Sequence, residues 1–502
     1  MANLTELRNE RIRKLNELKK IGIDCYPSHV ERDVEIGELV NNFDKYIDKE
    51  LSVVGRIEAI RKFGKISFIR ISDQSGTIQL FLQQSTVEPL DVNKNTIGYS
   101  EIPLLDVGDF LSVRGKVIVT KTSEKSIDVK TINILDKTLR PLPNQIDGFS
   151  SKEERLRRRY VDLNVNKEIR DRYVRRSIFW QSVRKYLDGA GFIEINTPVL
   201  EHTTGGADAK PFVTHMNALN EDFYLRISQE LPLKKLLGGG FEKVYDIGPR
   251  FRNENYSDEH LPEHMAMESY MAYQNYEEAI KFYERFLKFI AQETWGRLTF
   301  KIQDFEIELD QDWPIVRYQD IMFEKYGVDV FKPDIKQLKS ILDQNNVKLD
   351  GQINILRALD NVWKLIRSNS AGPFWLVGEP ILLSPLAKSD PKNNQVSLRF
   401  HPVIGGSEMG NGYAELNDPI DQLNRFSEQQ KLRDSGDDEA QMLDIDFVEM
   451  LEYGMPPACG WGISERFFWA LEGVTAREGV PFPQLRSEID GVTKSIYPEI
   501  FK

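Results

Sequence analysis

Apolar residues follow a helical pattern at the start of the chain. Six of them between residues 4 and 21 recur at spacings that mark one face of a helix, and Gly22 follows as a stop signal. The pattern predicts one amphipathic helix. Its opposite face is basic, and we interpret that face as solvated rather than as a binding surface. The basic residues are Arg8, Arg11, Arg13, Lys14, Lys19 and Lys20.

Beyond the helix the pattern changes to short β-branched runs separated by turn residues. These runs predict five strands, and turn-forming pairs such as Ser75-Gly76 and Gly108-Asp109 lie between them. Five strands of this length predict a small β-barrel of the OB type. The predicted strands cover residues 51–60, 66–71, 77–82, 110–119 and 126–135.

Residues 140–143 read Arg-Pro-Leu-Pro, a stiff stretch that ends the strand pattern, and we expect a domain boundary there. The later elements do not repeat as strand, helix, strand, so a doubly wound parallel sheet is not predicted. We expect an α+β fold with a mixed or antiparallel sheet flanked by helices. The expected helices cover 171–190, 277–294 and 434–453, and the expected strands 223–227, 243–247 and 412–416. The expected division is a helical segment 1–50, a barrel 51–140 and a second domain 141–502.

Composition and charge limit the possible classes of protein. The chain has 502 residues, with 66 Lys and Arg against 78 Asp and Glu, a net charge of −12. The whole molecule is therefore not a basic nucleic-acid binder, although residues 51–140 hold 13 basic against 10 acidic side chains. Only Cys25 and Cys459 are cysteines, and no apolar run approaches the ~20 residues that span a bilayer. We expect a cytoplasmic protein that uses neither disulfides nor a membrane.

Several enzyme signatures are missing from the sequence. No phosphate-binding loop of the Gly-x-x-x-x-Gly-Lys-Ser/Thr type occurs, and no His-Glu-x-x-His or Gly-x-Ser-x-Gly. The remaining chemistry lies in clusters of arginines and carboxylates. Arg252 and Glu254 form the first, and an alternating segment follows in which His264, Glu268 and Tyr270 share one face of a strand.

Two glycine-rich segments follow. Residues 405–417 hold four glycines among carboxylates and amides, and a strand with so many glycines loses stability unless something approaches its backbone closely. Alternation puts Asn411, Tyr413 and Glu415 on one face of this strand, together with Asn417. Residues 460–466 then lead into an apolar helix that begins with Arg466, whose guanidinium could bind phosphate.

The order and separation of these clusters resemble those of motifs 1, 2 and 3 of the class II aminoacyl-tRNA synthetases. Residues 191–200 would be motif 1. The resemblance is closest to lysyl-tRNA synthetases of the bacterial type, and it covers nearly the whole chain from the barrel onward. It implies that lysine and ATP form lysyl-adenylate, and that the lysyl group then passes to the terminal adenosine of tRNA(Lys). It also implies Mg²⁺ as a cofactor and a homodimer formed through motif 1. A lysine carboxylate is already ionised at pH 7, so the attack on ATP needs no general base.

The resemblance assigns roles around ATP. Arg252 would clamp the α-phosphate and the lysine carboxylate, and Arg466 the γ-phosphate, which makes these two the catalytic residues. Glu254 would accept from the adenine amino group, and His264 would stack on the ring. The implied ATP-binding residues are Arg252, Glu254, His260, His264, Glu408 and Arg466.

It also implies a lysine pocket, in which Glu230 would face the α-ammonium group and Glu415 the ε-ammonium group. An aspartyl enzyme would need a cation at Glu415, so charge argues against that relative. Rejection of arginine has to come from the shape of the pocket. The implied lysine-binding residues are Glu230, Arg252, Glu268, Tyr270, Asn411, Tyr413 and Glu415.

In the barrel the resemblance implies that an exposed aromatic ring, with amide and guanidinium groups beside it, reads the anticodon. The alternative is that Phe68 faces the barrel core. The implied anticodon residues are Arg61, Phe68, Gln79 and Glu124.

The sequence departs from the family at three places. His401 stands where the family has a glutamate metal ligand, so Glu408 is the expected ligand, because Mg²⁺ prefers oxygen. His264 replaces a phenylalanine, and motif 3 is one residue short. These departures keep open a catalytically silent RNA-binding protein, and the reaction alone leaves open a protein as the acceptor of lysine.

Overall fold

The computed structural model describes residues 4–143, 151–254, 257–347, 355–436 and 440–501. The chain forms two compact units. The barrel unit consists of Met1–Asn166 together with Gln484–Lys502, and the sheet unit of Lys167–Pro483. The barrel unit thus extends beyond residue 140 to Asn166 and also takes in the final segment Gln484–Lys502. A boundary at residue 140 would assign both stretches to the second domain.

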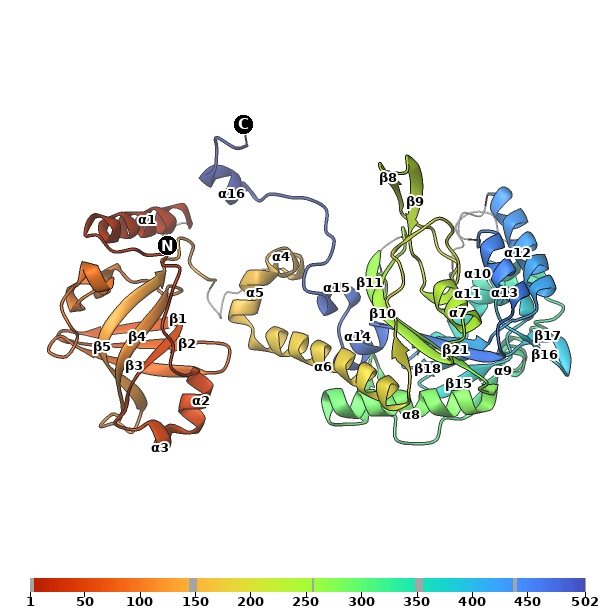
Figure 1. Cartoon of the computed structure of the whole chain (residues 1–502), viewed down its shortest axis with the longest axis horizontal. Coiled ribbons are helices and arrows are strands. Elements are labelled where there is room, and N and C mark those ends of the chain that lie inside the picture. Colours follow the sequence, from red (N-terminus) through yellow and green to blue (C-terminus); the bar gives the residue numbers. More distant parts are fainter. Residues whose placement is uncertain (1–3, 144–150, 255–256, 348–354, 437–439, 502) are drawn as a thin grey trace. The chain divides into compact units, whose positions relative to one another are not determined.

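The five predicted strands form a closed barrel with the order β1-β2-β3-β5-β4 (Figure 1). The OB-type prediction is therefore confirmed. Alternate side chains point inward, as in β2, where Ser67, Ile69 and Ile71 are buried. The strands are β1 (Glu50–Phe63), β2 (Ile66–Ser72), β3 (Thr77–Gln83), β4 (Phe110–Val119) and β5 (Lys125–Asp136).

Helix α1 (Leu4–Lys20) confirms the predicted amphipathic helix. Leu15 and Leu18 pack into the barrel core, and Gly22 ends the segment with a positive φ of 88°. The expectation of a solvated basic face is wrong for Arg11, which is buried and donates 2.8 Å to the Val107 carbonyl.

The end of the chain packs within the barrel unit. The guanidinium of Arg158 donates 2.6 Å to Asp490, and Arg8 lies 5.4 Å above the ring of Tyr497. The remaining elements of this unit are α2 (Ile36–Asn41), α3 (Phe43–Tyr46), η1 (Val92–Lys94), η2 (Tyr99–Leu104), α4 (Lys152–Arg157), α5 (Arg159–Val165) and α16 (Gly491–Ile496).

The sheet unit is built on one large sheet with the strand order β14-β15-β18-β20-β21-β11-β10-β6. Its centre is antiparallel, and parallel pairs occur at both edges, β14 with β15 and β10 with β6. The prediction of a mixed sheet is confirmed. The strands are β6 (Ile193–Glu194), β10 (Lys243–Phe251), β11 (Glu263–Ala272), β14 (Ile315–Arg317), β15 (Phe374–Val377), β18 (Arg399–Ile404), β20 (Asn411–Ala414) and β21 (Ala458–Ser464), with β19 (Ser407–Glu408) beside β18.

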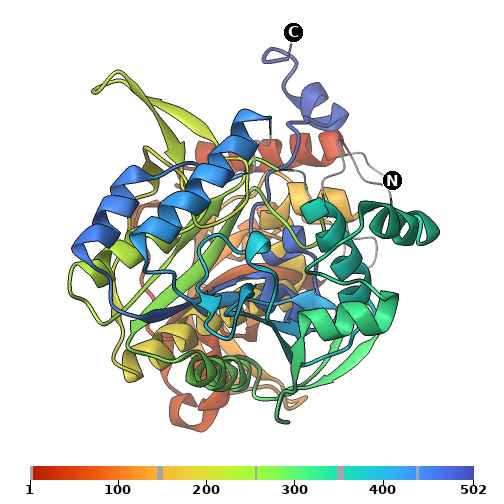
Figure 2. The ribbon, with the colours of Figure 1, turned by 90° about the vertical axis from the view of Figure 1, so that its right-hand side faces the viewer.

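The two faces of β11 belong to different environments. Met267 and Met271 join the aromatic core beneath α8 (Tyr276–Trp295), to which α6 (Lys167–Gly189) also contributes. Tyr270 instead packs with residues of α7 (Glu230–Gly238), α12 (Pro419–Asp434) and α13 (Ile445–Tyr453). Helices α12 and α13 lie side by side (Figure 2). The face that carries Tyr270 is the one that holds the site described below.

The predicted helix over 434–453 is wrong in its first half. Helix α12 already ends at Asp434, Gly436 follows with a φ of 104°, and α13 begins only at Ile445. Asp444 caps α13 by accepting 2.9 Å from the backbone N–H of Phe447. The break therefore follows from a glycine and a capping aspartate that the apolar spacing alone conceals.

Smaller elements complete the sheet unit. They are β7 (Leu200–Glu201), β8 (Val213–Met216), β9 (Glu221–Leu225), β12 (Thr299–Ile302), β13 (Phe305–Glu308), α9 (Tyr318–Tyr326), α10 (Ile335–Gln344), α11 (Ile355–Ser368), η3 (Ile381–Leu383), β16 (Ser389–Asp390), β17 (Asn393–Ser397), α14 (Arg466–Glu472) and α15 (Ala476–Gly479). Among the described residues, no helix is long and apolar enough to cross a membrane.

Candidate functional site

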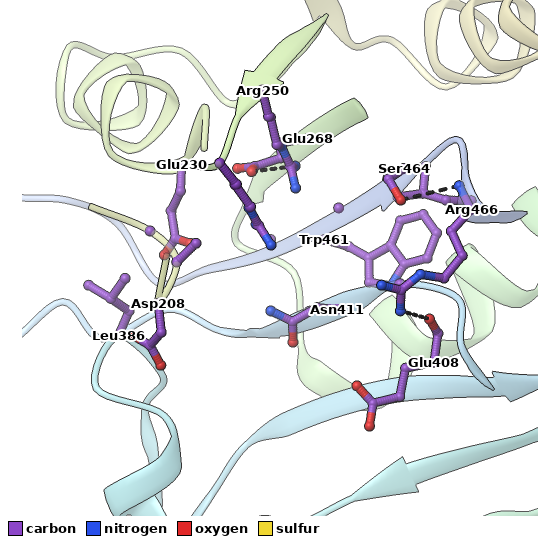
Figure 3. A pocket seen from close by; sticks show the side chains of 18 of the residues that line it. Asp208, Glu230, Arg250, Glu268, Leu386, Glu408, Asn411, Trp461, Ser464 and Arg466 are labelled. Carbon is purple, nitrogen blue, oxygen red and sulfur yellow. Dashed lines mark hydrogen bonds and ion pairs between the residues drawn. The ribbon is translucent and has the colours of Figure 1, made fainter. Parts of the chain in front are cut away.

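A cavity of about 310 Å³ lies on the sheet unit, on the side of α7. Figure 3 shows Glu230 toward one end, Arg466 and Glu408 toward the other, and Asn411 between them. The cavity brings together all of the residues that the sequence predicts for ATP and lysine. They are Glu230, Arg252, Glu254, His260, His264, Glu268, Tyr270, Glu408, Asn411, Tyr413, Glu415 and Arg466.

The glycines around the cavity make room for side chains. A Cβ on Gly460 would lie 2.2 Å from the ring of Tyr270 and 2.3 Å from Glu415 Oε1, so only glycine keeps this wall of the pocket open. A Cβ on Gly412 would lie 2.5 Å from Trp461. The groups that lie close to the backbone of the glycine-rich strands are therefore side chains of the cavity wall. Asn417, expected on the same face, is not among the lining residues, and its amide donates 3.1 Å to the Met455 carbonyl.

Arginines gather at one end of the cavity. Arg252 follows directly after β10, and its buried Nε has no hydrogen-bond partner among the described residues. Burial and the neighbouring Arg250 lower the pKa of Arg252 to about 10, so its guanidinium remains charged at pH 7. Arg466 begins α14, and its guanidinium contacts the Nε2 atom of His260. This end of the cavity therefore offers charged donors that suit an anion.

Two histidines beside these arginines are neutral at pH 7. Desolvation, with Arg466 close by, lowers the pKa of His260 to about 4, although part of this side chain stays exposed. Burial and Arg252 hold the pKa of His264 well below its usual range. The Nδ1 atom of His264 lies 3.2 Å from the Leu261 carbonyl oxygen. A neutral ring in this position suits stacking on a planar ligand better than binding of an anion.

Glu268 organises the middle of the cavity. Its Oε1 atom accepts 2.5 Å bonds from Arg250 and from the hydroxyl of Ser228, and Oε2 accepts 2.8 Å from the Tyr270 hydroxyl. Gln229 in turn accepts 2.8 Å from Arg250 Nε. Because its partners come from β10, β11 and the segment before α7, this carboxylate is fixed in orientation.

Glu230 and Glu415 meet at the end of the cavity opposite the arginines, and both are buried there. Lys234 Nζ lies 2.6 Å from Glu230 Oε1 and also contacts Glu415, and the Tyr413 hydroxyl donates to Glu230. Burial raises the pKa of both carboxyl groups, that of Glu415 to about 8, whereas Lys234 acts in the opposite direction. Lys234 is fully buried and is not among the residues that line the cavity.

His401, a residue of β18, is buried and lies outside the cavity lining. Its Nε2 is 3.4 Å from Glu379 and its Nδ1 is 3.8 Å from Glu408. Glu408 itself accepts 2.5 Å from Trp363 Nε1 and lies 3.8 Å from Arg367 Nε. Burial alone would raise the pKa of Glu408, but these neighbours lower it by more, so the carboxylate stays ionised.

The sequence reasoning missed three charged residues of this site. Arg250 lies on β10, two positions before Arg252, which directly follows the strand, and this spacing could have identified it. Arg399 pairs with Glu379 at 2.9 Å and donates 2.9 Å to Asn411, and no motif in the sequence marks it. Lys234 adjoins Lys235 on α7, and nothing local shows which of the two is buried.

On the barrel, Phe68 points outward, so the alternative of a core position is excluded. It forms a cross-strand row with Arg61 on β1 and Phe81 on β3. The Phe68 and Phe81 rings stack at 5.3 Å, and Phe63, which is 64% exposed, meets Phe68 edge to face at 6.1 Å. Partly exposed stacked rings of this kind suit unpaired bases.

The other predicted barrel residues lie on neighbouring strands. Gln79, on β3, donates 3.0 Å to the Ser126 hydroxyl and sits opposite Arg70. Glu124 is exposed in the turn between β4 and β5, one residue before β5 begins. The row of rings and these polar groups thus occupy adjoining parts of the barrel.

Known families match both parts of the chain. Residues 151–486 match the family described as tRNA synthetases class II (D, K and N). This range includes every cavity residue named above. Residues 51–135 match the OB-fold nucleic acid binding domain, which coincides with the barrel.

Whole-chain relatives agree with these matches. The Lysine--tRNA ligase of Thermotoga maritima is 38% identical over 490 residues, 96% of each chain. That of Roseiflexus castenholzii is 38% identical over 492 residues, 96% of this chain and 99% of the relative. That of Enterococcus faecalis is 36% identical over 499 residues, 97% of this chain and 99% of the relative. The chain therefore belongs to the class II aminoacyl-tRNA synthetases, in the lysine--tRNA ligase family.

Proposed function

We propose that this protein activates L-lysine with ATP and transfers the lysyl group to the 3'-terminal adenosine of tRNA(Lys). The observation that carries the proposal is the single cavity that has arginines at one end and buried carboxylates at the other. An anion such as ATP suits the first end, and an amino acid with a cationic side chain suits the second. Family membership supports the same reaction.

At the arginine end, Arg252 would bind both the α-phosphate and the lysine carboxylate and hold the two reacting groups together. Its unpartnered buried Nε supports this role, because a ligand oxygen would satisfy it. Arg466 would bind the terminal phosphates. Because lysine arrives with an ionised carboxylate, positioning and charge stabilisation do the catalytic work.

At the carboxylate end, the shared contact with Lys234 supports a change to the expectation from sequence. Glu230 and Glu415 both contact the ammonium group of Lys234, so we assign both to the side-chain ammonium of the substrate. We assign the α-ammonium to Glu268, which is held by Arg250 nearer the arginine end. Tyr270, Tyr413 and Asn411 would line the aliphatic chain between these ends.

For Mg²⁺, the residues fit one ion held through Glu408 and the oxygens of ATP. Glu408 is ionised and lines the cavity, and Mg²⁺ commonly binds through one carboxylate and substrate phosphates. His401 does not fit as its second ligand, because it lies outside the lining and offers nitrogen. No group of three or more His, Cys, Asp or Glu side chains suited to a metal occurs in the described part of the chain. When bound, the ion would neutralise part of the phosphate charge.

The barrel would bind the anticodon through the row of rings at Phe68, with Arg61, Gln79 and Glu124 as polar contacts. A homodimer is supported by exposed apolar side chains on α6 and motif 1. Val174, Ile178 and Ile193 are 49%, 36% and 51% exposed in the single chain. Apolar groups this exposed are typical of surfaces that a partner covers.

The deciding experiment is ATP–pyrophosphate exchange with each of the twenty amino acids, with Mg²⁺ and without tRNA. We expect exchange with lysine alone, and then charging of tRNA(Lys) in preference to a protein acceptor. Exchange with a different amino acid would keep the fold and reject the carboxylate assignments. Binding of tRNA without any exchange would instead favour a catalytically silent RNA-binding protein.

A further inference from the structure

The guanidinium group of Arg466 already has three partners within the protein. Its Nε atom lies 3.9 Å from a carboxylate oxygen of Glu259, and its Nη1 atom donates 3.4 Å to the backbone carbonyl of Glu408 (Figure 3). Its Nη2 atom contacts the Nε2 atom of His260. Burial lowers the pKa of Arg466, and Glu259 is the carboxylate that opposes this effect most. A phosphate that binds Arg466 therefore shares the guanidinium with a negatively charged side chain.

The side chain of Glu259 is held in this position from both sides. Its Oε1 atom accepts a 3.0 Å hydrogen bond from the hydroxyl of Ser407, a residue that is 4% exposed. Its backbone N–H donates 3.2 Å to the hydroxyl of Ser257, which in turn lies 2.6 Å from the Nδ1 atom of His260. Residues 257–260 thus form a turn that brings this carboxylate to the lining of the cavity.

The other carboxylates that line the cavity lie near other cations or toward the other end. The carboxylate of Glu408 is 3.8 Å from Arg367 Nε. Burial lowers the pKa of Arg252, and Glu254 acts in the opposite direction. Asp208 lies toward the end opposite the arginines (Figure 3). Glu408 and Glu254 thus each have an arginine besides the one proposed for the terminal phosphates.

A phosphate and a carboxylate that share one guanidinium repel each other, and such like-charge pairs weaken binding. Free ATP brings the whole charge of its phosphates to this place. In the magnesium complex the ion neutralises part of that charge. The repulsion should therefore weaken binding of the free nucleotide more than binding of the complex. AMP lacks the terminal phosphates and should not be affected.

We propose that Glu259 is a specificity-determining residue, which competes with the terminal phosphate of ATP for Arg466 and makes the cavity prefer the magnesium complex of ATP to the free nucleotide. The proposal rests on the proposed function, because it takes ATP as the ligand and Arg466 as the residue that binds its terminal phosphates. Glu408 would favour the complex by contributing a ligand to the ion. Glu259 would favour it by repelling the nucleotide that arrives without one.

The test is calorimetric titration of the full chain with three ligands: ATP in the presence of a chelator, ATP with excess Mg²⁺, and AMP. Glu259→Gln keeps the size of the side chain and removes its charge. This variant should bind free ATP at least about tenfold more tightly than the wild type does, and the magnesium complex at most about threefold more tightly. Its affinity for AMP should stay within about twofold of the wild type.

Asp258→Asn is the matched control, because it removes the same charge from the neighbouring residue. The side chain of Asp258 is exposed, and its backbone carbonyl, which accepts 2.7 Å from the N–H of Ala476, is kept by the substitution. All three affinities of this control should stay within about twofold of the wild type. A selective gain in affinity is also a result that a damaged fold does not produce.

The outcomes separate the two proposals. Weaker binding of free ATP by Glu259→Gln, or equal gains for ATP and AMP, would overturn the inference. Equal gains for free ATP and its magnesium complex would overturn it as well, because Glu259 would then not set the preference. A wild-type protein that binds neither form of ATP would overturn the proposed function, and the inference with it. Binding of ATP without lysine-dependent pyrophosphate exchange would reject the proposed reaction alone.

Discussion

Glu415 is the residue on which the proposed selection of lysine depends most directly. It is buried against Gly460, Tyr270 and Lys234, and a ligand reaches it only from within the cavity. Its role was expected from a resemblance to known motifs, whereas its partner Lys234 was not. Helix spacing places Lys234 and Lys235 on neighbouring positions, and only the packing of α7 against β11 and α13 shows which one is buried.

Glu415→Gln should weaken lysine binding by about thirtyfold or more and change ATP binding by less than about twofold. The amide keeps the size of the side chain but removes the charge that attracts an ammonium group. Separate titrations with lysine and with ATP measure the two effects. Equal losses for both ligands would contradict the assignment of Glu415 to the amino-acid end.

Lysine affinity should rise with pH between about 6.5 and 8.5. Burial raises the pKa of Glu415 to about 8, so below this pH a proton occupies the carboxylate and competes with the substrate ammonium. Above it the ionised carboxylate binds the ammonium directly. Titrations across this range in the wild type should show the rise, and Glu415→Gln should show a smaller one, because Glu230 remains. An affinity that falls with pH would contradict the sign of this argument.

Among the elements, the barrel was predictable because alternation decides both its strands and its faces. All five strands follow the expected ranges within a few residues, and burial alternates as the pleat requires. The helix expected over 434–453 was wrong in its first half, because α12 ends at Asp434 and α13 begins only at Ile445. The positive φ of Gly436 and the cap at Asp444 mark the break, and apolar periodicity reports neither of them.

Strand β2 offers a paired test of its two faces. Phe68→Ala should raise the KM for tRNA by about tenfold through the loss of stacking and leave the melting temperature nearly unchanged. Ile69→Ala, on the inner face, should destabilise the barrel by about 2–5 kcal/mol. Charging kinetics and thermal unfolding distinguish the two. If Phe68→Ala lowers the melting temperature as much as Ile69→Ala does, Phe68 stabilises the barrel and has no separate role in binding tRNA.

For the molecule as a whole, the fold class was predictable, but the grouping of its segments was not. The sequence suggested a cut at residues 140–143, whereas compactness joins the final segment 484–502 to the barrel unit. The reason is physical: contacts such as Arg158 with Asp490 link residues more than three hundred positions apart, and no local pattern reports them.

Subunit association should depend on the outer face of α6. Val174 and Ile178 are one helical turn apart and exposed, so replacing both with aspartate should convert a dimer into a monomer. Light scattering coupled to size-exclusion chromatography measures the mass. Tyr453→Asp is the matched control, because this residue is 87% exposed on α13 and should leave the mass unchanged. A dimer that survives the double replacement would locate the interface elsewhere.

The return of the final segment to the barrel unit has a consequence for biosynthesis. The barrel strands leave the ribosome early, but Asp490 and Tyr497, which contact Arg158 and Arg8, are translated only after the whole sheet unit. The unit that is made first is thus completed last. A chain cut short by a premature stop codon before residue 484 would contain every cavity residue and yet lack these contacts, so the barrel unit is completed only after the sheet unit has been made.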